Sequence, residues 1–222
     1  MVLTATKTDG SYNDAYADNL SLTLTGSSAP VIGKTLNAAP VKGKVLVRLP
    51  KGHGFVALSG AQQLPVGTQI DARRGAIQLL AASATAGKTQ TGTFSGAVFK
   101  LAQASKGRDK GLTTLSLLEG AIPGGPSYAS CHARRAGGPS GAAQAAAVNR
   151  RTLQLLHATA KGRFKTRGRY AAATVRGTIW DPADRCDGTL IRVRRGVVTV
   201  TDLVRHKTVT VRAGHSYLAK PR

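Results

Sequence analysis

The sequence is poor in acidic residues, aromatic residues and cysteine, and has no long hydrophobic run. The 222 residues include 10 Asp and Glu and 32 Lys and Arg, and Glu119 is the single glutamate. A glycosidase-like pair of carboxylates would therefore have to be built from aspartates in loop-like segments. No apolar run approaches the roughly 20 residues that a membrane helix needs. Residues 1–10 also lack the basic and apolar regions of a signal peptide.

The motifs of common enzymes are absent as well. Gly-Lys-Thr occurs at 33–35 and 87–89, but Ser28 and Ala82 occupy the positions where a phosphate-binding loop needs glycine. No Gly-x-Ser-x-Gly nucleophile motif is present. Cys131 and His132 are adjacent and the other histidines are scattered, which is not a zinc-ligand spacing. We therefore expect no enzymatic activity, no metal site and no cofactor.

The abundant feature is positive charge, with a formal net charge of +22 and a pI of about 11.1. Residues 131–222 contain 19 basic and 4 acidic residues, so the charge is concentrated there. A field of this size attracts polyanions such as nucleic acids or acidic polysaccharides. A GC-rich genome would also favour arginine, and Arg outnumbers Lys by 19 to 13, so a compositional origin stays open. The candidate anion-binding residues are Arg163, Arg167, Arg169, Arg176, Arg192, Arg194 and Arg195.

Short apolar and β-branched runs are separated by Gly, Pro or Lys-Gly at intervals of about 8–12 residues. This spacing favours an all-β fold, an antiparallel sandwich or roll built from repeated β-hairpins. The runs at 197–201 and 208–212 alternate Val and Thr, and we expect them to pair as a hairpin. The other expected strands lie at 45–49, 55–58, 69–72, 76–80, 93–101, 112–118, 152–158, 163–166, 170–180, 190–194 and 216–219.

Composition divides the chain into four parts. Residues 1–26 alternate apolar and polar side chains, as the terminal strands of a preceding domain or an N-terminal hairpin would. Residues 31–120 form a first β-domain, and residues 121–147 are a Gly/Pro/Ala-rich excursion. Residues 148–222 form a second β-domain, either separate from the first or packed with it as one unit.

An internal repeat links the two β-domains. Residues 67–79 align with residues 188–200, and six of thirteen positions are identical, including Arg-Arg-Gly at 73–75 and 194–196. The pattern predicts a strand, a tight Arg-Gly turn and a second strand, with positive φ at Gly75 and Gly196. Chance alignment of two hairpins is the alternative to duplication.

The C-terminal residues 163–220 resemble the FecR-like family, and 43–101 resemble it more weakly through the repeat. The matching elements are a Val-Arg-Gly-Thr strand end at 175–178, Gly-Thr at 188–189, Gly196, and Ala-Gly at 213–214. The resemblance implies an extracytoplasmic β-rich module. Founding members of that family relay signals across a membrane, which requires a membrane helix that this chain lacks. Similar modules in large secreted or surface proteins of GC-rich actinobacteria are the closer likeness.

The N-terminal residues 9–24 resemble the closing strands of a jelly-roll domain of the carbohydrate-binding type, which end in Asp-Asn-Leu-Ser-Leu. That likeness implies that Met1 lies inside a larger surface protein. In a chain that looks secreted, the only two cysteines, Cys131 and Cys186, predict one disulfide. The alternative is two free buried thiols in a cytoplasmic protein.

We therefore expect a non-enzymatic, extracytoplasmic structural or binding module of a bacterial surface or secreted protein. Its expected partner is an anionic cell-envelope polymer or a surface protein, and its expected location is extracellular or at the cell surface. The alternative is a basic nucleic-acid-binding β-domain, in which Phe164, Tyr170 and Trp180 would stack on bases between arginines. If those rings fill the core instead, that alternative loses its stacking platform.

Overall fold

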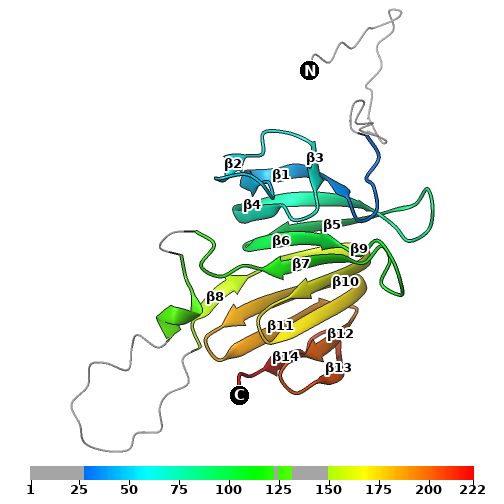
Figure 1. The fold of residues 1–222 in the computed structure, drawn as a ribbon. Helices are drawn as coiled ribbons and strands as arrows, with labels where there is room; N and C mark the ends of the chain where they lie inside the picture. The colour runs from blue at the N-terminus through cyan, green and yellow to red at the C-terminus, as the bar shows by residue number, and fades with distance from the viewer. Residues whose placement is uncertain (1–27, 123–124, 132–149) are drawn as a thin grey trace, which may run out of the picture.

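The computed structural model describes residues 28–122, 125–131 and 150–222 (Figure 1). The strands expected within 1–26 and most of the excursion 121–147 lie outside these residues. The described chain is nearly all β, which confirms the predicted fold class. Its one helical element is the short 3₁₀ turn η1 (Tyr128–Cys131). In the described part of the chain, no helix has the length and apolarity to cross a membrane.

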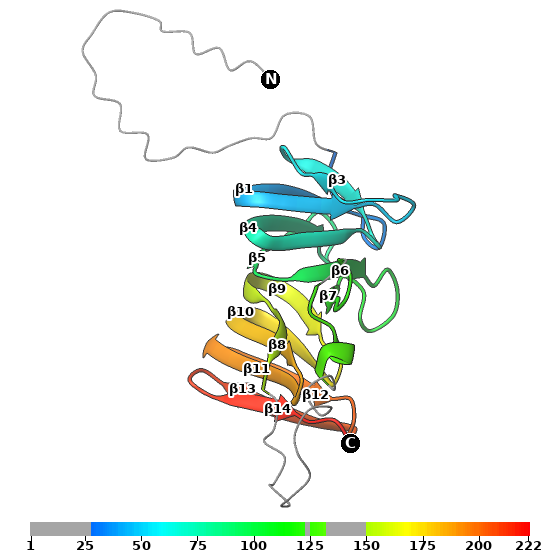
Figure 2. The same ribbon diagram turned by 90° about the vertical axis from the view of Figure 1, so that its left-hand side faces the viewer.

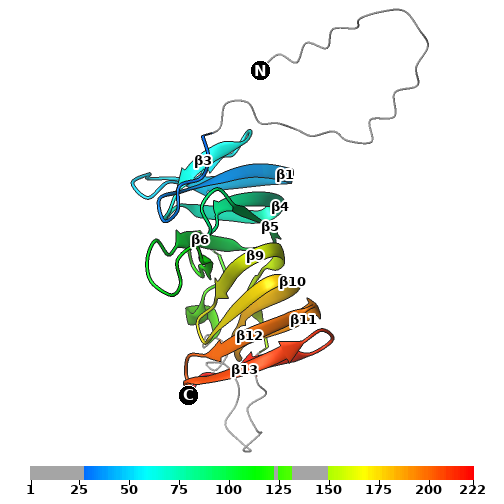
Figure 3. The same cartoon turned by 90° about the vertical axis from the view of Figure 1, so that its right-hand side faces the viewer.

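In the described residues, fourteen strands are hydrogen-bonded into one continuous sheet. Figures 1, 2 and 3 show them stacked from β1 and β3 at one end to β13 and β14 at the other. The strands are β1 (Thr35–Arg48), β2 (Val56–Ala57), β3 (Gln62–Pro65), β4 (Gln69–Ala82), β5 (Thr89–Ser95), β6 (Val98–Gln103), β7 (Thr113–Leu117), β8 (Thr152–Leu155), β9 (His157–Arg167), β10 (Ala171–Arg185), β11 (Gly188–Arg195), β12 (Val197–Asp202), β13 (Lys207–Arg212) and β14 (Ser216–Ala219).

The sheet folds over itself because its long strands bend sharply in the middle. Residues 69–71 of β4 pair with β6, whereas residues 76–82 pair with β5. Residues 171–175 of β10 likewise pair with β12, and residues 179–185 pair with β11. Each bent strand therefore contributes one half to each of two layers, and the core lies between the layers.

These bends correct the expectation of tight Arg-Gly hairpin turns. Arg74-Gly75 lies inside the uninterrupted strand β4, and Lys161-Gly162, expected to separate two strands, lies inside β9. In the C-terminal copy of the repeat, β11 and β12 flank Gly196 and both pair with β10. The repeated unit is thus one strand that bends, because both of its halves bond to the same neighbouring strand instead of to each other.

Glycine is required at the bends for two different reasons. Gly196 has the expected positive φ of 84°, which L-residues with side chains resist. Gly75 is not among the residues with positive φ, so that expectation is wrong. There the constraint is space, because a Cβ at Gly75 would lie 2.6 Å from the carbonyl oxygen of Lys42 on β1.

The predicted hairpin between 197–201 and 208–212 is confirmed as β12 and β13. Val198, Val200 and Val211 point into the core and Val209 packs against it, whereas Val197 at the start of β12 is exposed. Thr199, Thr208 and Thr210 point outward. Asp202 is fully buried at the hairpin end, and it accepts hydrogen bonds from Val204 N, Arg205 N and the Tyr217 hydroxyl. Burial opposes ionisation of this carboxyl, but the hydrogen bonds outweigh burial and hold its pKa below the ordinary value.

The aromatic side chains unite the two predicted β-domains in one core. Phe94 of β5 packs against Phe99 at 6.1 Å and against Phe164 of β9 at 5.6 Å between ring centroids. β9 pairs with β5 and, in parallel, with β7, so ranges 31–120 and 148–222 are hydrogen-bonded to each other. Trp180 is fully buried, and its indole N–H donates to the Thr166 hydroxyl at 3.1 Å.

Cys131 and Cys186 form a disulfide with their Cα atoms 5.5 Å apart. The bond connects η1 to the turn between β10 and β11. Arg169 stacks on the Tyr128 ring of η1, 4.5 Å from its centroid. The described end of the excursion is therefore attached to the C-terminal half of the sheet.

Candidate anion-binding rims

The bends of the C-terminal strands lie side by side and bring basic residues together. Gly162 of β9, Gly177 of β10 and Gly196, between β11 and β12, mark neighbouring bends, each with positive φ. Basic residues adjoin these bends, and all of them except the half-buried Arg163 are exposed. We call this set the C-terminal rim: Lys161, Arg163, Arg176, Arg195 and Arg212.

The rim crosses four strand positions of the sheet. Arg163 of β9 lies directly opposite Arg176 of β10, and Arg212 of β13 lies opposite Val197 of β12. Because neighbouring strands are about 4.8 Å apart, the three arginines span about 14 Å. Like charges in such proximity repel one another, so an anionic ligand that lies along the row relieves unfavourable electrostatic energy.

The carboxylates of the described residues are already engaged and leave most of this row unneutralised. Arg176, Arg195 and Arg212 form no salt bridge within the described chain. The acidic contacts are Asp71 with Arg73, Asp109 with Arg163, Asp181 with His157 and Arg194, Asp187 with Arg185, Asp202 with Arg205, Glu119 with the Tyr128 N–H, and Asp184 with the Arg169 N–H.

A row of hydroxyl groups lies beside the cations on the outer surface of the same layer. Lys165 of β9 is in register with Thr174 of β10, which is opposite Thr199 of β12, and Thr199 is opposite Thr210 of β13. None of these four side chains is buried. The surface therefore offers hydroxyl groups next to fixed positive charge, a combination that suits a hydroxylated, anionic polymer.

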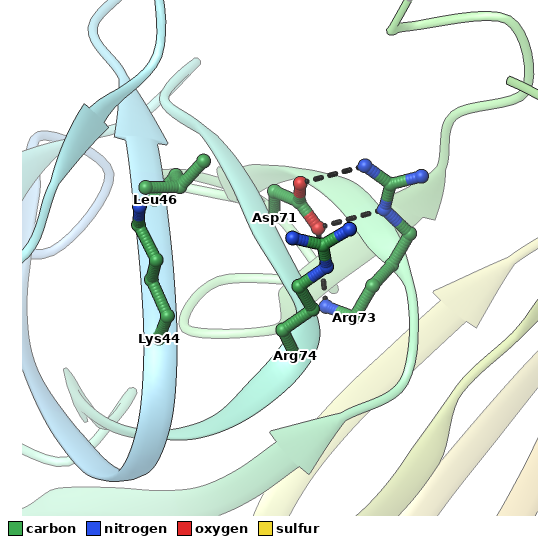
Figure 4. Close-up of a pocket in the computed structure, with 5 residues that line it drawn as sticks. All are labelled: Lys44, Leu46, Asp71, Arg73 and Arg74. Carbon is green, nitrogen blue, oxygen red and sulfur yellow. Dashed lines mark hydrogen bonds and ion pairs between the residues drawn. The ribbon is translucent and has the colours of Figure 1, made fainter. Parts of the chain in front are cut away.

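A second basic cluster flanks the bends of β1 and β4, and we call it the N-terminal rim: Lys42, Lys44, Arg73 and Arg74. Lys44 lies directly opposite Arg74 across the two strands, and both are exposed. Figure 4 shows Lys44, Arg73 and Arg74, together with Leu46 and Asp71, around a cavity of about 180 Å³. Asp71 accepts hydrogen bonds from the Arg73 guanidinium at 3.0 Å, which raises the pKa of Arg73.

The seven arginines named from the sequence lie in three places. Arg163, Arg176 and Arg195 belong to the C-terminal rim. Arg192 and Arg194 lie on β11, where the guanidinium of Arg194 pairs with Asp181, which the His157 ring also contacts at 2.8 Å. Arg167 and Arg169 line a cavity of about 240 Å³ near η1.

Asp184 and Arg169, which line that cavity, are held by contacts within the chain. Asp184 is 2% exposed and accepts hydrogen bonds from the Arg169 N–H and the Thr189 hydroxyl. Burial raises the pKa of the Asp184 carboxyl despite these hydrogen bonds. Arg169 covers the rings of Tyr128 and Tyr170, so its guanidinium is held by contacts within the chain.

Sequence reasoning missed the N-terminal rim and, in the C-terminal rim, Lys161 and Arg212. The repeat contained the necessary signal, because Arg73-Arg74-Gly75 aligns with Arg194-Arg195-Gly196. In both copies the first arginine pairs with a buried aspartate, Asp71 or Asp181, and the second arginine has no salt bridge in the described chain. The net charge indicated a site only in the C-terminal third, whereas basic residues cluster at strand bends in both halves of the chain.

No protein-family model, curated protein or solved structure matches this chain. The arrangement of residues in the structure and the composition of the sequence are therefore the basis for assigning a function.

Proposed function

We propose that the chain is a non-enzymatic, extracytoplasmic structural and binding module that holds an anionic cell-envelope polymer along its C-terminal rim. The observation that carries this proposal is the row of Arg163 on β9, Arg176 on β10 and Arg212 on β13, beside Arg195. Asp109 pairs with Arg163, and the other three arginines form no salt bridge in the described chain. The disulfide between Cys131 and Cys186 supports an oxidising compartment. The likeness to FecR-like modules of surface and secreted proteins supports the same location.

The neighbouring threonines favour an acidic polysaccharide over a nucleic acid. Phe164 and Trp180 are fully buried and Tyr170 packs against the core, so the rings named for base stacking fill the interior. Sequence-independent binding of single strands relies on such exposed rings. The outer surface beside the C-terminal rim instead presents the hydroxyl groups of Thr174, Thr199 and Thr210.

The test is binding to fluorescent hyaluronate and to duplex DNA, measured by anisotropy between 50 and 200 mM salt. The rim variant is Arg176→Ala/Arg212→Ala. Its matched control is Lys34→Ala/Lys51→Ala, which removes the same charge from exposed positions near the β1 end of the stack. Each lost ionic contact should lower the slope of log K against log salt by about 1.

We expect the rim variant to lower that slope by about 2 and the control to change it by less than 0.5. Equal effects of the two variants would refute a localised site, since net charge alone would then explain binding. DNA binding at least tenfold tighter than hyaluronate binding at 150 mM salt would overturn the polysaccharide assignment in favour of nucleic acid.

A further inference from the structure

The two basic rims lie on opposite sides of the folded sheet, along the bends of its strands. Strand β5 shows this, because it runs from one of these sides to the other. At its end, Gly96 N donates to the carbonyl oxygen of Ala72, next to Arg73 and the bend of β4. At its start, the side chain of Gln90 accepts a hydrogen bond from Arg163 N at 2.8 Å, next to the bend of β9.

Strands β1 and β4 therefore bend near the Gly96 end of β5. Strands β9 and β10, and the chain between β11 and β12, bend near the Gln90 end. Gly96 lies six positions after Gln90, which corresponds to about 20 Å along an extended strand. The rims are also displaced across the sheet, because β5 separates β4 from β9. In Figure 1, β1 and β4 lie in the upper part of the stack and β9, β10 and β12 in the lower part.

This separation makes the rims electrostatically independent at physiological salt. The Debye length is about 8 Å at 0.15 M ionic strength, so the rims are more than two Debye lengths apart. The surface between them at β5 and β9 is largely uncharged, with Thr93 directly opposite Thr159. Each rim thus attracts polyanion through its own field and not as one extended positive surface.

We infer that the two rims bind two different polymer chains at once, so that one protein molecule cross-links an anionic polysaccharide. This inference rests on the proposed function and adds a second binding surface, the N-terminal rim, to it. The N-terminal rim supplies the second contact, because Lys44 and Arg74 face each other on adjacent strands without a salt bridge to either in the described chain. A bound anion between them would offset their repulsion.

The experiment uses the full chain and long-chain hyaluronate at 100 mM salt, with binding and light scattering recorded on the same samples. The variant Lys44→Ala/Arg74→Ala removes the N-terminal rim contact, and Lys34→Ala/Lys51→Ala is again the charge-matched control. For the wild type we expect scattering that rises and then falls as protein is added, since excess protein caps each chain separately. The control should behave similarly.

The N-terminal rim variant should bind hyaluronate within threefold of the control but scatter at least fivefold less. Scattering equal to that of the control would overturn the inference, because bridging would then need only one rim. A dimer found by sedimentation of the protein alone would also overturn the inference. Two subunits could then bridge two polymer chains by using one rim each. Absence of binding by the wild type would instead refute the proposed function itself.

Discussion

Removal of the Cys131–Cys186 disulfide should destabilise the protein by about 4 kcal/mol. The bond joins residues that are 55 positions apart, and the intervening chain contains β8, β9 and β10. In the chain-entropy treatment, a closed loop of about 55 residues restricts the unfolded chain by about 14 cal/mol/K, or about 4 kcal/mol at 25 °C. This is a large part of the 5–15 kcal/mol by which domains are commonly stable.

The assay is urea unfolding followed by the fluorescence of Trp180, the single tryptophan. With an m-value of about 2 kcal/mol/M, the double variant Cys131→Ser/Cys186→Ser should unfold at a midpoint about 2 M lower than the oxidised wild type. Reduced and alkylated wild type should lose a similar amount. Adding reductant to the double variant should change nothing, which controls for other effects of the reagent.

A midpoint shift below about 0.5 M would refute this reasoning. It would mean that the unfolded chain already holds these two segments close together, so that the bond removes little entropy. A loss well above 4 kcal/mol would indicate that the contacts of Tyr128 in η1 with Arg169 and with the Tyr170 ring, 5.7 Å away between centroids, also depend on the bond. Arg169→Ala in the reduced protein distinguishes that case, because the contact would no longer contribute.

Three further predictions concern the bends and the buried polar groups. Gly75→Ala should cost about 2 kcal/mol or more in urea unfolding, because its Cβ would collide with β1 carbonyl oxygens, whereas Gly54→Ala, with open space around it, should cost less than about 0.5. Thr166→Val should cost about 1–3 kcal/mol by leaving the buried indole N–H without an acceptor, measured the same way. The lowered pKa of Asp202 means that its ionised form stabilises the fold at neutral pH, and that this contribution is lost as pH falls below about 4, through the folded pKa. Tyr217→Phe should cost about 1–2 kcal/mol at pH 7 and make the acid-induced loss smaller, which unfolding at pH 7 and pH 3 would check; an unchanged pH dependence would contradict it.

Local pattern was sufficient for the features that depend on neighbours in sequence. Alternating Val and Thr at 197–212 predicted the β12–β13 hairpin, because side chains along a strand alternate between its two sides. The spacing of glycines and prolines predicted an all-β chain. The two cysteines had only one possible intramolecular pairing, and it is the one observed.

The sequence by itself thus determined the class of fold, one hairpin, one covalent link and an excess of positive charge. Only the tertiary structure decided that Arg-Gly marks a bend and not a turn, because a strand bends when both its halves find partners on the same neighbour. It also decided which cations are neutralised, since Asp71 and Asp181 reach Arg73 and Arg194 while Arg74 and Arg195 form no salt bridge in the described chain. The placement of the rims on opposite sides of the folded sheet depends on the pairing of β5 with β9. This is a contact between residues distant in sequence that no local pattern encodes.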